Sequence, residues 1–189
     1  DYFVNEYLRG RTPNPCVMCN RDIKWGALLK KAEALGADFI ATGHYARVRF
    51  DEEKKRTIIS RAKFAQKDQS YALWAVSQRA LSKTLFPLGE KTKPDVRELA
   101  QQFGLRTAQK EESYEICFVA DNDYSRFLKE RTAQLNLQIS GGDVMFGGEV
   151  VGKHQGYPFY TVGQRKGVGA YGRKVYVTGI EVETNTVHI

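Results

Sequence analysis

Apolar positions near the start of the chain first recur with helical spacing and then form a short strand-like run. The helical spacing predicts one buried face, formed by Ile23, Ala27, Leu28, Ala32 and Leu35. Gly36 stands where the C-terminal cap of this helix belongs. The run at 39–41 predicts a short buried strand of a parallel α/β sheet. Ligands gather at the carboxyl ends of such strands, which favours Gly43 and His44 as ligand-proximal residues.

Further along the chain, the pattern predicts a hairpin and two helices. Apolar residues flank a charged run within residues 46–62, which indicates two antiparallel arms and a solvated tip. A helix is expected over 69–81 and another over 94–103. Thr92 is the expected N-cap of the latter helix, with Asp95 closing a capping box.

The pattern changes towards the C-terminus. Residues 116–119 are predicted to form a strand and 121–131 a short helix, after which glycines become frequent. Short β-prone runs such as Val175-Tyr176-Val177 lie between these glycines. We therefore expect an α/β domain over residues 1–131 and a small β-rich domain over 132–189.

Composition adds a partner class and a compartment. The formal net charge is +7, which favours a polyanion such as nucleic acid, although a merely basic surface has the same charge. No apolar run is long enough to predict a membrane span, and no leader is predicted. The chain starts at Asp1 and ends at Ile189 within a strand-like run, which is typical of a piece of a longer protein.

The three cysteines are the residues most indicative of chemistry. An odd, small number is not a disulfide scaffold, so a reducing cytoplasm is expected. Cys16 and Cys19 stand at the start of the first predicted helix, where the helix N-terminus favours a nucleophilic thiolate. The polar residues before Cys117 indicate a loop that reaches a surface or a cleft.

Three other interpretations of the cysteines stay open at this point. A zinc site would need Cys117, His44 and His154 to complete it, without paired spacing. A thioredoxin-like redox motif would follow a strand, whereas the preceding segment is a proline-rich loop. The cysteines can also be buried core residues without chemistry.

Five segments, taken together and in order, resemble the bacterial tRNA-specific 2-thiouridylases. They are Gly10–Asn20 (GRTPNPCVMCN), Ala41–Arg47 (ATGHYAR), Lys67–Tyr71 (KDQSY), Glu112–Phe118 (ESYEICF), and Gly156 with Tyr160–Gly167 (YTVGQRKG). The matches cover nearly the whole chain, and five in order make the resemblance specific.

The resemblance implies a fold, an activity and partners. The fold would be part of a Rossmann-like ATP-pyrophosphatase (PP-loop) domain followed by a small β-rich central domain. The activity would be ATP-dependent 2-thiolation of the wobble uridine of tRNA by a cytoplasmic sulfurtransferase, with ATP as co-substrate together with magnesium. The implied partners are tRNA and a persulfide-donating sulfur relay protein, and no membrane.

The resemblance also implies roles for individual residues. Cys19 would be the nucleophile and Cys117 the persulfide carrier, the two forming a disulfide during sulfur release, and both are expected to face a common cleft. Gly43 would contact ATP, and no metal site is expected. The implied tRNA contacts are Asn14, Pro15, Cys16, Lys67, Asp68 and Gln69. Basic residues at 165–166 and 173–174 would meet phosphates.

Two departures from the family pattern matter. Some members have Asp where this chain has Cys16, which puts a proposed proton-transfer role in doubt here. The Ser-Gly-Gly-x-Asp-Ser-like ATP loop and the C-terminal β-barrel are not in this sequence, so the chain alone is expected to be inactive. The alternatives are a related ATP-pyrophosphatase that acts on another substrate, and a noncatalytic tRNA-binding or zinc-binding module.

Overall fold

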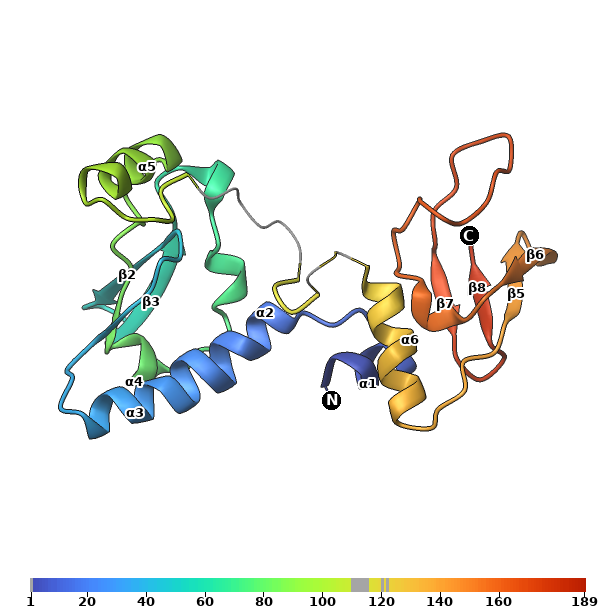
Figure 1. Cartoon of the computed structure of the whole chain (residues 1–189), viewed down its shortest axis with the longest axis horizontal. Helices are drawn as coiled ribbons and strands as arrows, with labels where there is room; N and C mark the ends of the chain where they lie inside the picture. The colour runs from blue at the N-terminus through green and yellow to red at the C-terminus, as the bar shows by residue number, and fades with distance from the viewer. Residues whose placement is uncertain (1, 110–115, 120, 122) are drawn as a thin grey trace. The chain divides into compact units, whose positions relative to one another are not determined.

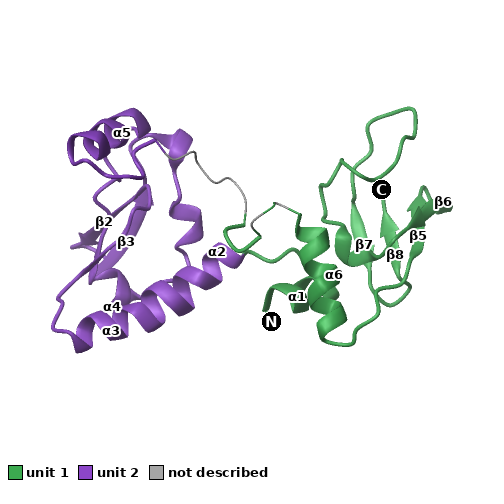
Figure 2. Cartoon of the chain, in the orientation of Figure 1, with its two compact units in different colours: residues 1–14, 115–189 green, residues 15–114 purple. Residues whose placement is uncertain are grey.

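The computed structural model describes residues 2–109, 116–119, 121 and 123–189. The chain divides into two compact units, which Figure 2 shows in different colours. Unit 1 comprises residues 1–14 and 115–189, and unit 2 comprises residues 15–114. The division into domains at residue 131 stays a prediction, because compactness alone does not define a domain.

A continuous helix with a π-helical centre opens unit 2 (Figure 1). It consists of α2 (Pro15–Met18), the π-helix η1 (Cys19–Leu28) and α3 (Leu29–Ala34). Gly36 follows with a φ of 79°, a left-handed conformation that glycine adopts without strain. The helix and its glycine cap are thus confirmed.

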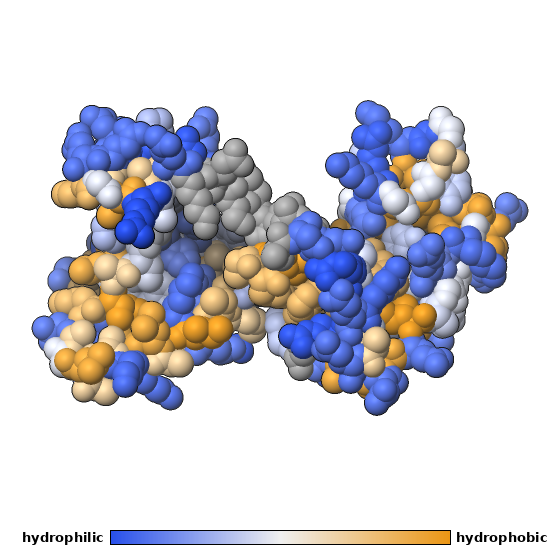
Figure 3. All heavy atoms as spheres, in the orientation of Figure 1, coloured by the Kyte–Doolittle hydropathy of each residue, from blue (hydrophilic) through white to orange (hydrophobic). Residues whose placement is uncertain are grey.

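The predicted buried face of this helix is wrong. Ile23, Leu28 and Leu35 are 60%, 51% and 75% exposed. The buried positions are Val17, Asn20, Trp25 and Leu29. Their spacing of three, five and four residues follows from the π-helical centre, because bonds from residue i to i+5 shift the buried side by one residue relative to an α-helix. Figure 3 shows the apolar surface that results along this helix.

The helix packs on a short parallel sheet, as predicted from the succession of helix, glycine and short apolar run in the sequence. Strand β1 (Ile40–Ala41) pairs in parallel with β4 (Thr84–Leu85). The Trp25 Nε1–H donates to Thr84 Oγ1 at 2.7 Å, which satisfies the one polar atom of a buried indole. The core around this sheet consists of Trp25, Leu29, Ile40, Ala46, Leu73, Val76, Ala80 and Leu81. Burial of a large apolar side chain here contributes roughly 1.5–3 kcal/mol.

The predicted hairpin is confirmed. Strands β2 (Ala46–Asp51) and β3 (Arg56–Arg61) pair antiparallel along their whole length. The charged residues between them form a turn, in which Lys55 has a φ of 48°.

The predicted helix over 69–81 is wrong. Within this range the chain instead forms a 3₁₀ turn, η3 (Ser70–Ala72), and a short helix, α4 (Gln78–Leu81), and another 3₁₀ turn, η2 (Ala65–Lys67), precedes them. Ser77 begins α4 as an N-cap, because its Oγ accepts the N–H of Ala80 at 3.3 Å. Polar side chains that bond to the nearby backbone favour turns over an uninterrupted helix.

Helix α5 (Lys93–Gln102) forms with the predicted cap. Thr92 and Asp95 each accept the backbone N–H of the other, which is a complete capping box. The apolar stripe on α5 is not buried in unit 2, since Phe103 is 74% exposed.

Unit 1 begins with a helix that the sequence analysis did not predict. Helix α1 (Tyr2–Leu8) buries Phe3, Val4 and Tyr7 beside α6 (Tyr124–Gln134). Helix α6 corresponds to the short helix expected over 121–131, and the side chain of Asp123 caps it by accepting the N–H of Arg126 at 2.9 Å.

The strand expected at 116–119 is a turn. The N–H of Val119 donates to the carbonyl of Ile116 at 2.9 Å. The Phe118 ring packs edge-on against Phe3, with centroids 5.2 Å apart, and Val119 is buried. An aromatic anchor therefore holds a tight turn where apolar composition alone suggested a strand.

The remainder of unit 1 is a four-stranded sheet in the order β6-β5-β8-β7. Its elements are β5 (Gly142–Phe146), β6 (Glu149–His154), the 3₁₀ turn η4 (Tyr157–Phe159), β7 (Gly179–Glu181) and β8 (Thr186–His188). Strands β5 and β8 are parallel, and the outer pairs are antiparallel. The β-prone run at 175–177 lies outside these strands, although Val175 and Val177 are buried in the core of the sheet.

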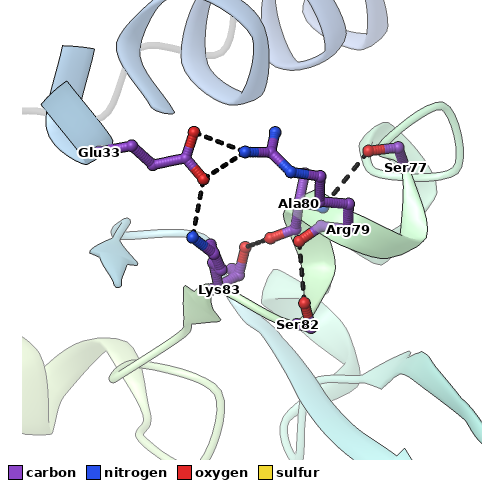
Figure 4. Close-up of polar contacts among 7 residues, drawn as sticks. Glu33, Ser77, Arg79, Ala80, Ser82 and Lys83 are labelled. Carbon is purple, nitrogen blue, oxygen red and sulfur yellow. Dashed lines mark hydrogen bonds and ion pairs between the residues drawn. The ribbon is translucent and has the colours of Figure 1, made fainter. Parts of the chain in front are cut away.

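An ion-pair network joins α3 to α4 in unit 2. Figure 4 shows both Glu33 oxygens accepting from Arg79, at 2.6 and 2.7 Å, and one of them also accepting from Lys83 at 2.8 Å. The hydrogen bonds from Lys83 and Arg79 lower the pKa of Glu33 below its ordinary value of 4.5. The Glu33 side chain is 20% exposed, whereas that of Arg79 is 65% exposed.

We predict that Glu33→Gln lowers the thermal midpoint of unfolding at neutral pH. The folded-state pKa of Glu33 is lowered, so its contribution is present above pH 4.5 and is lost as the pH falls through the folded-state value. The difference between wild type and variant should therefore shrink in acid. Glu52→Gln, which removes one exposed pair with Lys55, is the control and should change little. An equal midpoint for Glu33→Gln at pH 7 would show that the network does not stabilise the fold.

Candidate functional site

The two neighbouring cysteines lie in the first turns of the helix that opens unit 2. Cys16 is the second residue of α2 and is exposed, whereas Cys19 is the first residue of η1 and is partly exposed. No disulfide joins any of the three cysteines, all of which the structure describes. Neither cysteine is buried, so the interpretation of the pair as buried core residues is wrong.

Cys117 lies in unit 1, on the exposed turn that Phe118 anchors. The expectation of a surface loop at Cys117 is confirmed, although residues 110–115, which precede it, lie outside the described residues. The common cleft for Cys19 and Cys117 stays a prediction, because the two residues belong to different units.

Gly43 lies directly beyond the carboxyl end of β1 and is exposed. Its backbone does not require glycine, because its φ is not in the left-handed region and an added Cβ would meet only Leu88 Cδ1, at 3.8 Å. The loop around it is held in place, since the N–H of Thr42 donates to the carbonyl of Leu85 at 3.1 Å. Gly43 thus exposes its backbone at the edge of a fixed loop.

His44, the next residue, is held as a neutral imidazole. Its Nε2 lies 3.4 Å from the Nζ of Lys24, and its Nδ1 lies 2.8 Å from Thr42 Oγ1. An ammonium group only donates, so Nε2 is the acceptor and the proton is on Nδ1, which donates to Thr42. Burial, followed by the charge of Lys24, lowers the pKa of His44 to about 4. The ring also packs among the aromatic side chains of Trp25 and Phe86.

In the segment expected to contact tRNA, the side chains of Asp68 and Gln69 bind other parts of unit 2. Asp68 accepts the N–H of Ala62 at 2.8 Å, and Gln69 Oε1 accepts the N–H of Tyr45 at 3.0 Å. Lys67 ends the turn η2 and is partly exposed. Asp68 and Gln69 therefore have structural partners that their sequence motif does not reveal.

Asn20 is a residue of this region that sequence reasoning did not single out. It directly follows Cys19, is 1% exposed and donates from Nδ2 to the carbonyl of Ala72 at 2.9 Å. A polar residue in a predicted helix is usually exposed to solvent. The burial of Asn20 is therefore evident only from the π-helical register of the structure. Among the expected tRNA contacts, Pro15 begins α2, while Asn14 is exposed and belongs to unit 1.

Unit 1 has an exposed basic loop between η4 and β7. The loop lines a cavity of about 400 Å³, with Arg165, Arg173 and Lys174 on its wall. The Arg173 guanidinium also lies 4.3 Å from the centroid of the Phe146 ring, a cation–π distance. In the described part of the chain, no three His, Cys, Asp or Glu residues are grouped as a metal site would require, and no described helix is long and apolar enough to span a membrane.

Comparison with known protein families accounts for almost the whole chain. Residues 1–121 match the model described as tRNA methyl transferase HUP domain. Residues 125–189 match the model described as tRNA methyl transferase PRC-barrel domain. The chain belongs to this family. The expected fold class, a Rossmann-like α/β domain followed by a small β-rich domain, is confirmed by this pair of models.

Curated relatives carry a more specific name than the family models do. Proteins named tRNA-specific 2-thiouridylase MnmA are similar to this chain: the Salinibacter ruber protein at 56% identity over 99% of the chain, and the Amoebophilus asiaticus protein at 58% over 98%. The protein of the same name from Carboxydothermus hydrogenoformans is 55% identical over 100% of the chain. The chain spans about half the length of these relatives, at 50–52%.

We predict that the imidazole of His44 titrates near pH 4 in an NMR experiment. Its folded-state pKa lies below the ordinary 6.5, so the unfolded chain takes up the proton first. The contribution of His44 to stability is therefore complete above pH 6.5 and declines as the pH falls towards 4. Lys24→Gln should raise the pKa only part of the way, because burial is the larger cause. A midpoint near 6.5 in wild type would contradict the buried, neutral ring.

Proposed function

We propose that this chain is part of a tRNA-uridine 2-sulfurtransferase that thiolates the wobble uridine of tRNA. The observation that carries the proposal is the 56% identity, over 99% of the chain, to a protein named tRNA-specific 2-thiouridylase. The proposed organisation is an ATP-pyrophosphatase part over residues 1–131 and a central domain over residues 132–189. The partly exposed position of Cys19 and the exposed position of Cys117 support the proposal.

The proposed chemistry assigns one sulfur role to each unit. A sulfur relay protein loads a terminal sulfur onto Cys117 as a persulfide. ATP supplies the adenylyl group that makes the uridine O2 a leaving group. The thiolate of Cys19 attacks the inner sulfur of Cys117 and breaks the persulfide S–S bond, so the terminal sulfur keeps the electron pair and bonds to C2 as AMP departs with the oxygen. The two cysteines end as a disulfide, which a thiol reductant returns to thiols.

Gly43 is the proposed contact to ATP. The fold does not demand a glycine at this position, so an open backbone at the end of a parallel strand supports close approach of a ligand. The nearby Lys24 ammonium suits an anionic ligand. Magnesium accompanies ATP mainly through the phosphates, and no protein ligand is assigned to it.

Lys67, Arg165 and Lys166 are the proposed phosphate contacts for tRNA. Lys67 is partly exposed, and the two residues of the basic loop are exposed. Phosphate contacts of this kind supply affinity and orientation, whereas reading the base requires that it be splayed out of the anticodon loop. The formal net charge of +7 supports this assignment.

We predict that Cys19→Ser or Cys117→Ser in the full-length enzyme abolishes thiolation while tRNA affinity stays nearly unchanged. Loss of a nucleophile that acts in a relay lowers turnover by about a thousandfold or more. Thiouridine formed per enzyme would be measured beside a tRNA binding titration. Cys16→Ser is the matched control and should reduce activity less. If Cys16→Ser were as damaging as Cys19→Ser, the nucleophile would be misassigned or shared.

We also predict that this chain binds tRNA weakly and with strong salt dependence. Neutralised phosphates release counterions, so affinity should fall about tenfold or more between roughly 50 and 200 mM salt. Labelled tRNA would be titrated at both concentrations. The double variant Arg165→Ala/Lys166→Ala should reduce the salt slope, whereas Lys54→Ala, at the hairpin tip, should leave it unchanged. Binding that does not respond to salt would refute the electrostatic account.

A further inference from the structure

Residues 68–72, which we call the joint segment, are fixed to the end of the hairpin. Asp68 Oδ1 accepts the N–H of Ala62, the residue after β3, at 2.8 Å. Asp68 Oδ2 accepts the hydroxyl of Ser70 at 2.7 Å, and the segment then turns through η3. Its position is therefore set by unit 2 itself, without any nucleic acid.

The joint segment also holds the loop that contains Gly43. The N–H of Gln69 donates to the carbonyl of Tyr45 at 2.8 Å, and its Oε1 accepts the N–H of Tyr45 at 3.0 Å. Gln69 thus satisfies both main-chain groups of a residue two positions after Gly43, as a neighbouring strand would. The side chain of Tyr45 is buried, so this end of the loop is held by packing as well.

The other end of the joint segment holds the helix of Cys19. The buried Nδ2 of Asn20 donates to the carbonyl of Ala72 at 2.9 Å. The N–H of Ala72 in turn donates to the carbonyl of Gln69 at 3.1 Å. A continuous chain of hydrogen bonds therefore runs from the residue beside Cys19, through the joint segment, to the loop of Gly43.

We propose that Gln69 and Asn20 are positioning residues. Together they fix the ATP-contacting loop and the helix of Cys19 relative to each other. The inference rests on the proposed function. Gln69 acts on the nucleotide through Tyr45, and Asn20 acts on Cys19 through Ala72. Because the adjoining Lys67 is a proposed phosphate contact, tRNA would bind next to the joint segment, which links the loop to the helix.

The test is binding of Mg·ATP to the full-length protein in the absence of tRNA, measured by calorimetry. Gln69→Ala removes the acceptor for the N–H of Tyr45 and should weaken ATP binding about tenfold. Gln69→Glu keeps an acceptor oxygen at the same reach and should restore most of the affinity. Gln66→Ala, in the exposed part of η2, is the matched control and should bind ATP like wild type. If Gln69 only contacts tRNA, all three variants should bind ATP equally. That result would overturn the proposal.

The role proposed for Asn20 is tested by measuring the turnover number of a variant. Asn20→Leu removes the donor while keeping the number and branching of the side-chain heavy atoms, and it should lower kcat about tenfold at saturating ATP and tRNA, with the Kd for Mg·ATP unchanged. An unchanged kcat would overturn the role of Asn20, and a weakened Kd would show general loss of structure instead of positioning. Wild type that binds ATP and forms no thiouridine would refute the proposed function while leaving the role of Gln69 in holding the loop intact.

Discussion

Main-chain groups beside the short strands of unit 2 need hydrogen-bond partners, and side chains supply them. The sheets in the described part of this unit, β1-β4 and β2-β3, are two-stranded, so their ladders of hydrogen bonds are short. The Gln78 side-chain amide meets both main-chain groups of Thr57, at 2.9 and 3.0 Å, whereas Gln69 meets the carbonyl of Tyr45 with its own N–H and the N–H of Tyr45 with its side-chain Oε1. A buried polar group without a partner costs about 1–3 kcal/mol, so these glutamines stabilise the unit in place of further strands. The geometry of the candidate site depends on these hydrogen bonds from glutamines, which take the place of bonds to further strands.

Features governed by neighbours in sequence were predictable. The capping box of α5 follows from Thr92 and Asp95, three residues apart, and the hairpin follows from alternation on both sides of a charged turn. The glycine cap at Gly36 is equally local, because a left-handed residue commonly ends a helix and glycine adopts that conformation without strain. The candidate site residues came from motif resemblance instead, and their roles stay proposals, although the exposure of Cys117 on a turn agrees with the polar residues before it.

Features set by distant contacts were not predictable. The π-helical step that turns Trp25 inward is favoured by its bond to Thr84, 59 residues away, and no local pattern announces it. The turn at Cys117 is anchored by the contact of Phe118 with Phe3, a residue far earlier in the sequence. Where a helix was expected over 69–81, the chain forms η3 and α4 instead, and Gln69 bonds to Tyr45, a residue of another loop. In each case a tertiary contact outweighed a local propensity.

The same contacts explain how a rigid loop can still present an open residue. The loop after β1 is fixed before Gly43 by the hydrogen bond that Thr42 donates to Leu85, and after it by the two hydrogen bonds between Gln69 and Tyr45. The neutral ring of His44 packs inward. Gly43 alone faces outward without a side chain, so a ligand can approach its backbone while the flanking residues stay in place. Catalysis benefits from such an arrangement, because groups already held in position lose little freedom when the ligand binds. The small, two-stranded sheets of unit 2 are therefore compatible with a preorganised site, provided that the side-chain amides keep their hydrogen bonds.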